Sequence, residues 1–253
     1  MLFLYIVKSA DKKIETINNG VGKMKFNIID IDNWDRKECF ERYYNDCKCT
    51  YSLTVDMEIT NLYRYIRKHD LRLYPTFTWI VTRALNCYKE FKMAFNSEGK
   101  LGYFDFISPC YSVLNEKTKV MSDLITKYKE DFNKFYEAMV NDLEMYKKDK
   151  KYNTVFRENF YIVSSIPWIT YSSFNVNNET NIPMLFPMVT WGRYYEKDEK
   201  VFMPVSLQVH HSVADGYHCS LFYDEVKKYL IILINIYVYK KVGAAIKLAP
   251  ILL

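Results

Sequence analysis

Helical and strand-like patterns follow one another without a break from Lys25 to Tyr229, and this continuity limits the chain to one domain. No stretch rich in Pro, Gly or Ser interrupts it, and the 253 residues include only seven Gly and seven Pro. Linkers between domains usually have such a composition, so the pattern predicts one continuous domain without repeats. We expect this domain at residues 24–230, an N-terminal extension at residues 1–23 and a divergent apolar C-terminal tail at residues 231–253.

Apolar periodicity assigns most of this domain to helices and strands. Helices are expected at about residues 33–45 (capped by Asn33), 60–69, 74–91 and 123–148, and from Gly216 onwards. Strands are expected at residues 25–31, 51–57, 92–96, 103–106, 110–114, 159–164, 169–176, 184–195 and 201–210. Because the two kinds of element are interleaved, the fold class is α/β or α+β with a large mixed sheet.

Charge and hydropathy argue against two classes of partner. The net charge of +5 comes from 35 basic and 30 acidic residues spread along the chain, without the basic stripe that nucleic-acid binding needs. This excess suits a polyanionic small molecule equally well. The apolar run at residues 231–238 is far shorter than the roughly 20 residues that span a bilayer. We therefore expect neither a nucleic-acid nor a membrane partner.

The six cysteines do not form a spaced framework, and no convincing secretory signal precedes them. We expect free thiols in a reducing cytoplasm. Cys47 and Cys49 flank a single lysine, but no second Cys or His pair at zinc spacing accompanies them. The sequence therefore predicts no metal site.

Three of the four histidines fall within nine residues, His210-His211-Ser-Val-Ala-Asp-Gly-Tyr-His218. They follow a predicted strand and precede the last predicted helix, a junction of the kind that exposes catalytic groups on a rigid scaffold. Side chains alternate along an extended chain, so one histidine of the adjacent pair faces the cleft and the other packs inward. A neutral imidazole in a cleft can take a proton from a hydroxyl group.

Other interpretations of these histidines stay open at this point. A histidine pair is more often structural than catalytic. Zinc binding by His210, His211 and His218 is disfavoured, because adjacent histidines do not easily chelate one ion and a fourth ligand is missing. A serine nucleophile would usually come with a Gly-x-Ser-x-Gly elbow, which the chain lacks.

The string HHSVADGYH resembles the HHxxxDG motif of the chloramphenicol acetyltransferase family. Condensation domains of peptide synthetases, dihydrolipoyl acyltransferases and plant acyltransferases share the bare motif, but here the resemblance extends over about residues 25–229. The further matches are Asn33-Trp34-Asp-Arg36, Phe40-Glu-Arg-Tyr43, Tyr51-Ser-Leu-Thr, Tyr74-Pro75, Ser164-Ser-Ile-Pro167-Trp168, Ser173-Phe174-Asn175, Thr190-Trp-Gly-Arg-Tyr194 and Met203-Pro204.

The resemblance implies a two-layer sandwich of the CoA-dependent acyltransferase type. It implies transfer of an acetyl group from acetyl-CoA to the 3-hydroxyl of chloramphenicol in a ternary complex, which inactivates the antibiotic. Acetyl-CoA is then a co-substrate, and no metal is required. The implied assembly is a cytoplasmic homotrimer with active sites between subunits.

The resemblance also implies roles for single residues. His211 matches the general base, Ser164 the donor to the tetrahedral oxyanion, and Thr190 the hydroxyl that holds an ordered water. Asp215 matches a structural carboxylate that pairs with Arg36 and fixes the turn carrying the base.

Two sets of binding residues follow from the same resemblance. The acceptor would contact Tyr43, Cys49, Tyr51, Ser112, Met121, Phe174 and Val176. CoA would contact Arg72, Tyr74, Arg193 and Tyr194, with cations for its phosphates and a ring for its adenine. As a bare pattern, an aromatic or Met side chain at strand spacing is more often part of the core.

The chain also departs from the family. The motif contains Ser212-Val-Ala214 where many relatives have Ala and Cys, and all are small residues. Two alternatives to chloramphenicol acetylation remain. One is an acetyltransferase for another hydroxylated acceptor, because the expected acceptor pocket is variable around Arg42, Cys47 and Met121. The other is a ligand-binding protein of this fold whose catalysis has lapsed.

Overall fold

The computed structural model describes residues 25–154, 158–177 and 184–242, and for residues 234–242 only the course of the backbone. The predicted N-terminal extension at residues 1–23 lies outside the described residues, as do residues 243–253 of the predicted tail. The last helix, α6 (Gly216–Val242), runs without interruption through the predicted start of this tail at residue 231.

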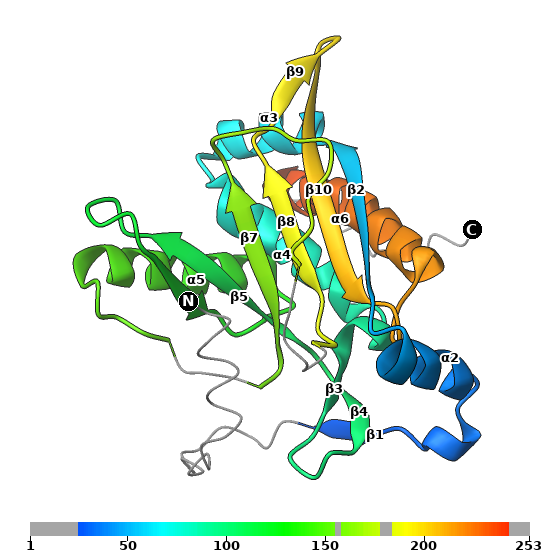
Figure 1. Ribbon diagram of the computed structural model, residues 1–253. Helices are drawn as coiled ribbons and strands as arrows, with labels where there is room; N and C mark the ends of the chain where they lie inside the picture. The colour runs from blue at the N-terminus through cyan, green and yellow to red at the C-terminus, as the bar shows by residue number, and fades with distance from the viewer. Residues whose placement is uncertain (1–24, 155–157, 178–183, 243–253) are drawn as a thin grey trace.

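Seven strands of the described residues form one mixed sheet (Figure 1). In spatial order they are β2 (Thr50–Glu58), β10 (Lys200–His210), β8 (Met188–Gly192), β7 (Phe160–Ile166), β5 (Ser108–Leu114) and β6 (Met121–Ile125), with the short β9 (Tyr195–Lys197) paired to β10. The strands β5, β7 and β8 are parallel to one another, and the other pairs are antiparallel. The predicted mixed sheet is confirmed.

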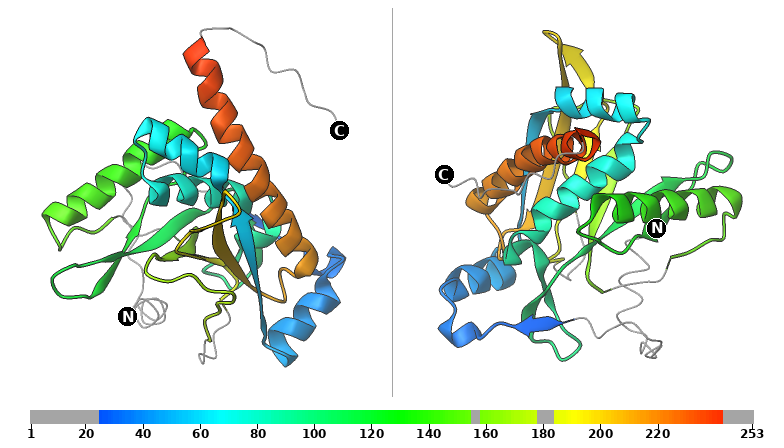
Figure 2. Two further views of the ribbon diagram at one scale, coloured as in Figure 1. Left: turned by 90° about the horizontal axis from the view of Figure 1, so that it is seen from above. Right: turned by 180° about the vertical axis from the view of Figure 1, so that it is seen from behind.

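Four long helices cover one face of this sheet and leave the other uncovered by helices (Figure 2). They are α3 (Thr60–His69), α4 (Leu73–Asn86), α5 (Phe132–Lys148) and α6. The chain therefore forms the expected two-layer sandwich. We call the face away from these helices the open face.

Shorter elements lie at one end of the sheet (Figure 1). A second, three-stranded sheet has the order β1–β4–β3. These elements are β1 (Phe26–Ile28), a 3₁₀ turn at Ile31–Asn33, α2 (Lys37–Glu41), a π-helical turn at Arg42–Asp46, a 3₁₀ turn at Lys89–Lys92, β3 (Met93–Phe95) and β4 (Leu101–Phe104).

The apolar helix α4 and the sheet build the main core. The side chains of one face of this helix have no exposed surface: Phe77, Ile80, Val81, Ala84 and Leu85. The ring of Phe77 meets Trp191 of β8 edge to face, with 5.0 Å between ring centroids. Residues one position away from Trp191 on β8 must point to the open face, because strand side chains alternate.

A row of four hydroxyl groups crosses the open face. The strand register pairs Ser164 with Thr190, Thr190 with Ser206, and Ser206 with Thr54, on β7, β8, β10 and β2. Paired residues of neighbouring strands point to the same face. Two members of this row, Ser164 and Thr190, are residues predicted to be catalytic.

The sheet splits between β5 and β7. We call this split the fork, and we call its two arms, β5 with β6 and β7 with β8, the prongs. These two strands pair from Ser108 only as far as Tyr111, which lies opposite Val163. Beyond that pair β5 continues to Leu114 alongside β6, while β7 continues alongside β8, so the two prongs separate (Figure 1). The fork opens next to Ser164, the first residue of β7 beyond the last pair.

The predicted helix at residues 123–148 is wrong in its first part. Residues Met121–Ile125 are strand β6, and the helix begins only at Phe132. Its N-cap is Asp131, whose side chain accepts a hydrogen bond from Lys134 N at 2.9 Å. The buried Leu124 fits the helical spacing by coincidence, because it faces the core from a strand rather than from a helix turn.

The predicted strand at residues 169–176 is also wrong, because this segment has no strand partner. It crosses the open face and is held by side chains. Gln208 of β10 exchanges two hydrogen bonds of 2.8 Å with the backbone of Val176. The Tyr171 hydroxyl donates to Thr190 O, also at 2.8 Å.

Other predicted boundaries also change. The strand expected at residues 184–195 is divided into β8 and β9. Asn33 does not cap a helix: its side chain donates to Asp30 Oδ2 at 2.7 Å, and α2 begins four residues later. At Asn33 a local polar contact thus replaces the expected helix cap.

Tyr223 ties helix α6 to the two long strands, and this contact is testable. Its buried hydroxyl accepts a hydrogen bond from Leu207 N at 3.1 Å and lies 2.7 Å from Leu53 O and 2.9 Å from Val205 O. Tyr223→Phe should lower the free energy of unfolding by about 1–3 kcal/mol, because it leaves buried backbone groups without a partner. Urea unfolding measures this, with Tyr217→Phe on the exposed side of α6 as the control. Equal stability of both variants would contradict the assignment.

Candidate active site at the histidine turn and the sheet fork

The end of β10 separates the two adjacent histidines. His210 is only 3% exposed, and its Nδ1 lies 2.7 Å from Ser212 Oγ. Burial, and to a lesser degree the neighbouring His211, lower the pKa of His210 to about 4, so its ring is neutral at pH 7. His211 is half-buried, and its backbone N–H donates to Cys49 O at 3.0 Å. His210 therefore packs inward, and His211 is the histidine available for chemistry.

Two tyrosines set the orientation of the His211 ring. Tyr43 stacks on it with 3.9 Å between ring centroids and 6° between planes, and Tyr51 meets it edge-on at 5.3 Å. Gly216 makes room for Tyr51, because a Cβ at this glycine would lie 3.0 Å from the tyrosine hydroxyl oxygen. His211 Nδ1 is buried and has no hydrogen-bond partner among the described residues.

Asp215 anchors the turn that follows His211. Its carboxylate lies 3.1 Å from Arg36 Nη1 and 2.9 Å from His218 Nδ1, so the structure contains the implied ion pair with Arg36. Burial would raise the pKa of Asp215, but the hydrogen bonds from Arg36 and His218 outweigh it and lower the pKa to about 2. The role of His218 was not predicted. The clue in the sequence is its spacing of three residues from Asp215, at the start of a helix.

The fork holds the other two residues predicted to be catalytic. Ser164 and Thr190 lie opposite each other on β7 and β8. Thr190 is 1% exposed, and its Oγ1 has no hydrogen-bond partner among the described residues. The two hydroxyls therefore stand side by side on the open face, where they could donate to an oxyanion or hold a water.

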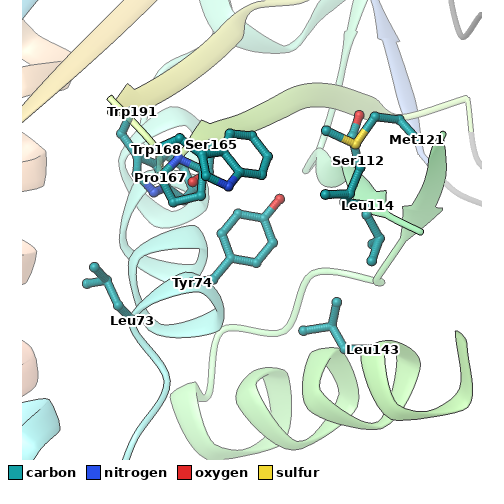
Figure 3. Close-up of a pocket in the computed structure, with 11 residues that line it drawn as sticks. Leu73, Tyr74, Ser112, Leu114, Met121, Leu143, Ser165, Pro167, Trp168 and Trp191 are labelled. Atoms are coloured by element: carbon teal, nitrogen blue, oxygen red, sulfur yellow. The ribbon is translucent and has the colours of Figure 1, made fainter. Parts of the chain in front are cut away.

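A pocket of about 350 Å³ opens at the fork (Figure 3). Its lining residues come from both prongs and from the helices behind them: Leu73, Tyr74, Ser112, Val113, Leu114, Met121, Leu143, Ser165, Pro167, Trp168 and Trp191. The Tyr74 hydroxyl points into it, is buried and has no partner among the described residues. Burial raises the pKa of Tyr74, so its phenol stays protonated and can donate a hydrogen bond.

The structure divides the predicted acceptor residues into three groups. Tyr43, Cys49 and Tyr51 surround the histidine turn. Ser112 and Met121 line the pocket at the fork. The remaining two, Phe174 and Val176, lie on the segment that crosses the open face, where Val176 is held by Gln208.

The predicted CoA residues also fall into two pairs. Arg72 and Tyr74 lie at the start of α4, where Arg72 already forms an ion pair with Glu144 at 2.6 Å. Arg193 and Tyr194 are exposed on the link between β8 and β9. The ring of Tyr74 packs on Trp191 with 5.5 Å between centroids, so both pairs adjoin the same part of β8.

His211 and Ser164 are far apart within one chain. His211 lies five residues beyond Ser206, and Ser206 is separated from Ser164 by one intervening strand, β8. With ~3.3 Å per residue and ~4.8 Å per strand, the backbone separation is roughly 20 Å. The two side chains therefore do not meet at one substrate atom within a single chain.

The described residues contain neither a candidate metal site nor a candidate membrane span. No group of three or more His, Cys, Asp or Glu side chains in this part of the chain could hold a metal ion. None of the helices in the same residues is both long and apolar enough to cross a bilayer. All six cysteines are free.

The family model for chloramphenicol acetyltransferase matches residues 24–227. The chain belongs to this family. A chloramphenicol acetyltransferase of Clostridium perfringens is 42% identical over 207 residues, which are 81% of this chain and 94% of that protein. One of Staphylococcus aureus is 44% identical over 207 residues, which are 80% of this chain and 97% of that protein. The chain is therefore an acyltransferase of this family, as the sequence predicted.

Solved structures agree on the fold. A chloramphenicol acetyltransferase superimposes with a TM-score of 0.72 at 22% identity, over 81% of this chain and 100% of the other. The cubic core of the pyruvate dehydrogenase multienzyme complex gives 0.57 at 13% identity, over 88% of this chain and 99% of the other. At these identities the likeness concerns the fold, which is the one predicted for CoA-dependent acyltransferases.

The Arg36–Asp215 pair predicts how stability depends on pH. The folded-state pKa of Asp215 is lowered from 3.8 to about 2, so the pair stabilises the protein above pH 4 and its contribution is lost as the pH falls towards 2. The shift corresponds to about 1–2 kcal/mol after allowance for the partial exposure of the carboxylate. Arg36→Met should lower the free energy of unfolding by part of this amount at pH 7, because His218 also hydrogen-bonds the carboxylate, and should partly flatten its fall between pH 4 and 2.

Urea unfolding at several pH values measures this effect. Lys37→Met is the matched control, because its partner Asp32 is 86% exposed and an exposed pair contributes little. An Arg36→Met variant with the acid dependence of the unaltered protein would exclude the pair as the cause.

Proposed function

We propose that the chain transfers an acetyl group from acetyl-CoA to the 3-hydroxyl of chloramphenicol and so inactivates the antibiotic. The main support is the half-buried His211. It occupies the position that the family motif assigns to the general base, next to a turn fixed by Asp215. Relatives that carry the name chloramphenicol acetyltransferase, at about 40% identity, point to the same acceptor. The free thiols agree with a reducing cytoplasm as the place of action.

His211 acts as the general base in this proposal. It removes the proton of the acceptor hydroxyl as that oxygen attacks the thioester carbonyl. When the tetrahedral intermediate collapses, the C–S bond breaks, and the proton held by His211 passes to the leaving CoA thiolate. Ser164 donates a hydrogen bond to the tetrahedral oxyanion, and Thr190 holds a water beside it. A positioned base contributes roughly 10²–10⁴-fold and one oxyanion donor about 10²–10³-fold. Placing two substrates together adds a further large factor.

The residues of the fork suit acetyl-CoA. The side of the pocket formed by Tyr74 and Trp191 is apolar except for one phenol donor, which has no partner among the described residues, and this fits a flexible acyl-bearing arm with few polar groups. Arg72 and Arg193 supply cations for the phosphates, and Tyr194 supplies a ring for the adenine. Arg72 would have to exchange Glu144 for a phosphate on binding. The thioester is already activated, so no metal step is required.

Completion of the site requires a second copy of the chain. Roughly 20 Å separate the backbones at His211 and Ser164, whereas both must reach one tetrahedral centre. A neighbouring copy can bring its own His211 to the open face beside Ser164 and Thr190. We therefore propose a homotrimer in which each site lies between subunits, a closed ring of heterologous contacts.

Another hydroxylated acceptor is the second candidate. The observation that favours it is a polar pair at the pocket: Ser112 of the pocket wall donates a hydrogen bond to the carboxylate of Asp123 at 2.7 Å. A carboxylate beside the pocket accepts a hydrogen bond from any alcohol that carries a second donor, so it suits other acceptors of this kind as well as chloramphenicol. The reaction and the roles of His211 and Ser164 would be unchanged.

Release of free CoA thiol tests the reaction directly. Purified protein with acetyl-CoA should release thiol when chloramphenicol is added, and His211→Ala should lower kcat by at least 10²-fold because the base is lost. Release only with other alcohols would favour the second candidate. No release with any alcohol would mean that catalysis has lapsed.

Mixing two inactive variants tests the position of the site between subunits. His211→Ala and Ser164→Ala chains, each inactive alone, should regain about a quarter of the full activity when they assemble together, because one interface in four then combines an intact His211 with an intact Ser164. Activity would be followed after co-expression and co-purification. Mixed assemblies that stay inactive would place both residues of one site on the same chain.

A further inference from the structure

Asp123 is a half-buried carboxylate without a cationic partner among the described residues. It lies on β6 opposite Ser112 of β5, and its only hydrogen bond within the described residues is the one from Ser112 Oγ to its Oδ1. Burial raises the pKa of Asp123. A carboxylate can accept about four hydrogen bonds, so most of its capacity is unused. Such a group is costly unless something else binds it.

The strand geometry places this carboxylate beside the pocket. Met121 lies two residues before Asp123, therefore on the same face of β6, and it lines the pocket. The intervening Ser122 points the other way, where it accepts a hydrogen bond from Tyr146 of α5 at 3.0 Å. Ser112, the partner of Asp123, also lines the pocket (Figure 3). Asp123 is thus on the open face.

Asp123 and Ser164 lie on opposite prongs of the fork but on the same face. Tyr111 and Val163 are the last pair of β5 and β7, and both belong to the main core behind the sheet. The next residues, Ser112 and Ser164, must therefore both point to the open face. A substrate that lies between the prongs would have Ser164 on one side and the Ser112–Asp123 pair on the other.

We propose that Asp123 is a specificity-determining residue, which accepts a hydrogen bond from an N–H or O–H group of the acceptor alcohol. Ser112 holds the carboxylate in place. This inference rests on the proposed acetyl transfer and adds the class of acceptor: a hydroxylated molecule with a second hydrogen-bond donor away from the reacting hydroxyl. The phosphates of CoA are assigned above to Arg72 and Arg193, away from β6, so the Ser112–Asp123 pair is left for the acceptor.

Steady-state kinetics of Asp123→Ala test the proposal. The KM for chloramphenicol should rise about 10- to 100-fold, the range for loss of a hydrogen bond to a charged group. The KM for acetyl-CoA should stay within about twofold, because the carboxylate does not contact the cofactor. Asp123→Asn keeps the shape and one acceptor oxygen, so its KM for chloramphenicol should lie between those of the unaltered and the alanine proteins.

Glu116→Gln is the matched control, because this exposed carboxylate lies in the turn of the same β5–β6 hairpin. It should leave both KM values unchanged. An unchanged KM for chloramphenicol in the Asp123 variants, or an equal rise of both KM values, would overturn the proposal. Asp123→Asn decides the matter if the alanine variant does not fold, as judged by its melting temperature.

The outcomes separate this inference from the proposed function. An unaltered protein that acetylates no alcohol removes the proposed function, and the inference falls with it. An active protein whose Asp123 variants keep the normal KM for chloramphenicol removes only the inference.

Discussion

Strand β10 is the constraint on which the other features depend. It is the longest strand described and is paired on both sides, with β2 over nine residue pairs and with β8 and β9 on the other edge. These ladders fix which of its residues face the core and which face outward. Ser206 thereby joins the row of hydroxyls, Gln208 anchors the crossing segment, and the strand ends in the buried His210 with His211 immediately beyond it.

Local features of the site could be predicted from the sequence. The histidine turn is built within nine residues, and alternation already implied that one histidine packs inward and one faces out. The large mixed sheet and α4 followed from strong periodicity, because apolar patterns of that length admit few other structures. The pairing of Asp215 with Arg36, 179 positions apart, came from the family resemblance alone, since no spacing rule links residues so far apart.

Features that depend on distant pairing could not be predicted. The fork exists because β5 leaves β7 for β6 after one particular pair, and no local pattern encodes such a change of partner. The misassigned stretches have the same cause: Leu124 and the segment at residues 169–176 satisfy periodic patterns while their neighbours in space decide their structure. Asp123 escaped notice because a single carboxylate in a strand gains meaning only when Ser112 is found opposite.

The hydroxyl row has a consequence for any surface that comes to lie against the open face. The hydroxyls of Thr54 and Ser206 form a hydrogen bond with each other at 2.7 Å. The Thr190 hydroxyl, in contrast, is buried without a partner among the described residues. A purely apolar surface packed here would leave the Thr190 hydroxyl without a partner, at a cost of about 1–3 kcal/mol. An interface that forms here must therefore enclose ordered water or supply polar groups of its own, and it will be more hydrated than an apolar core.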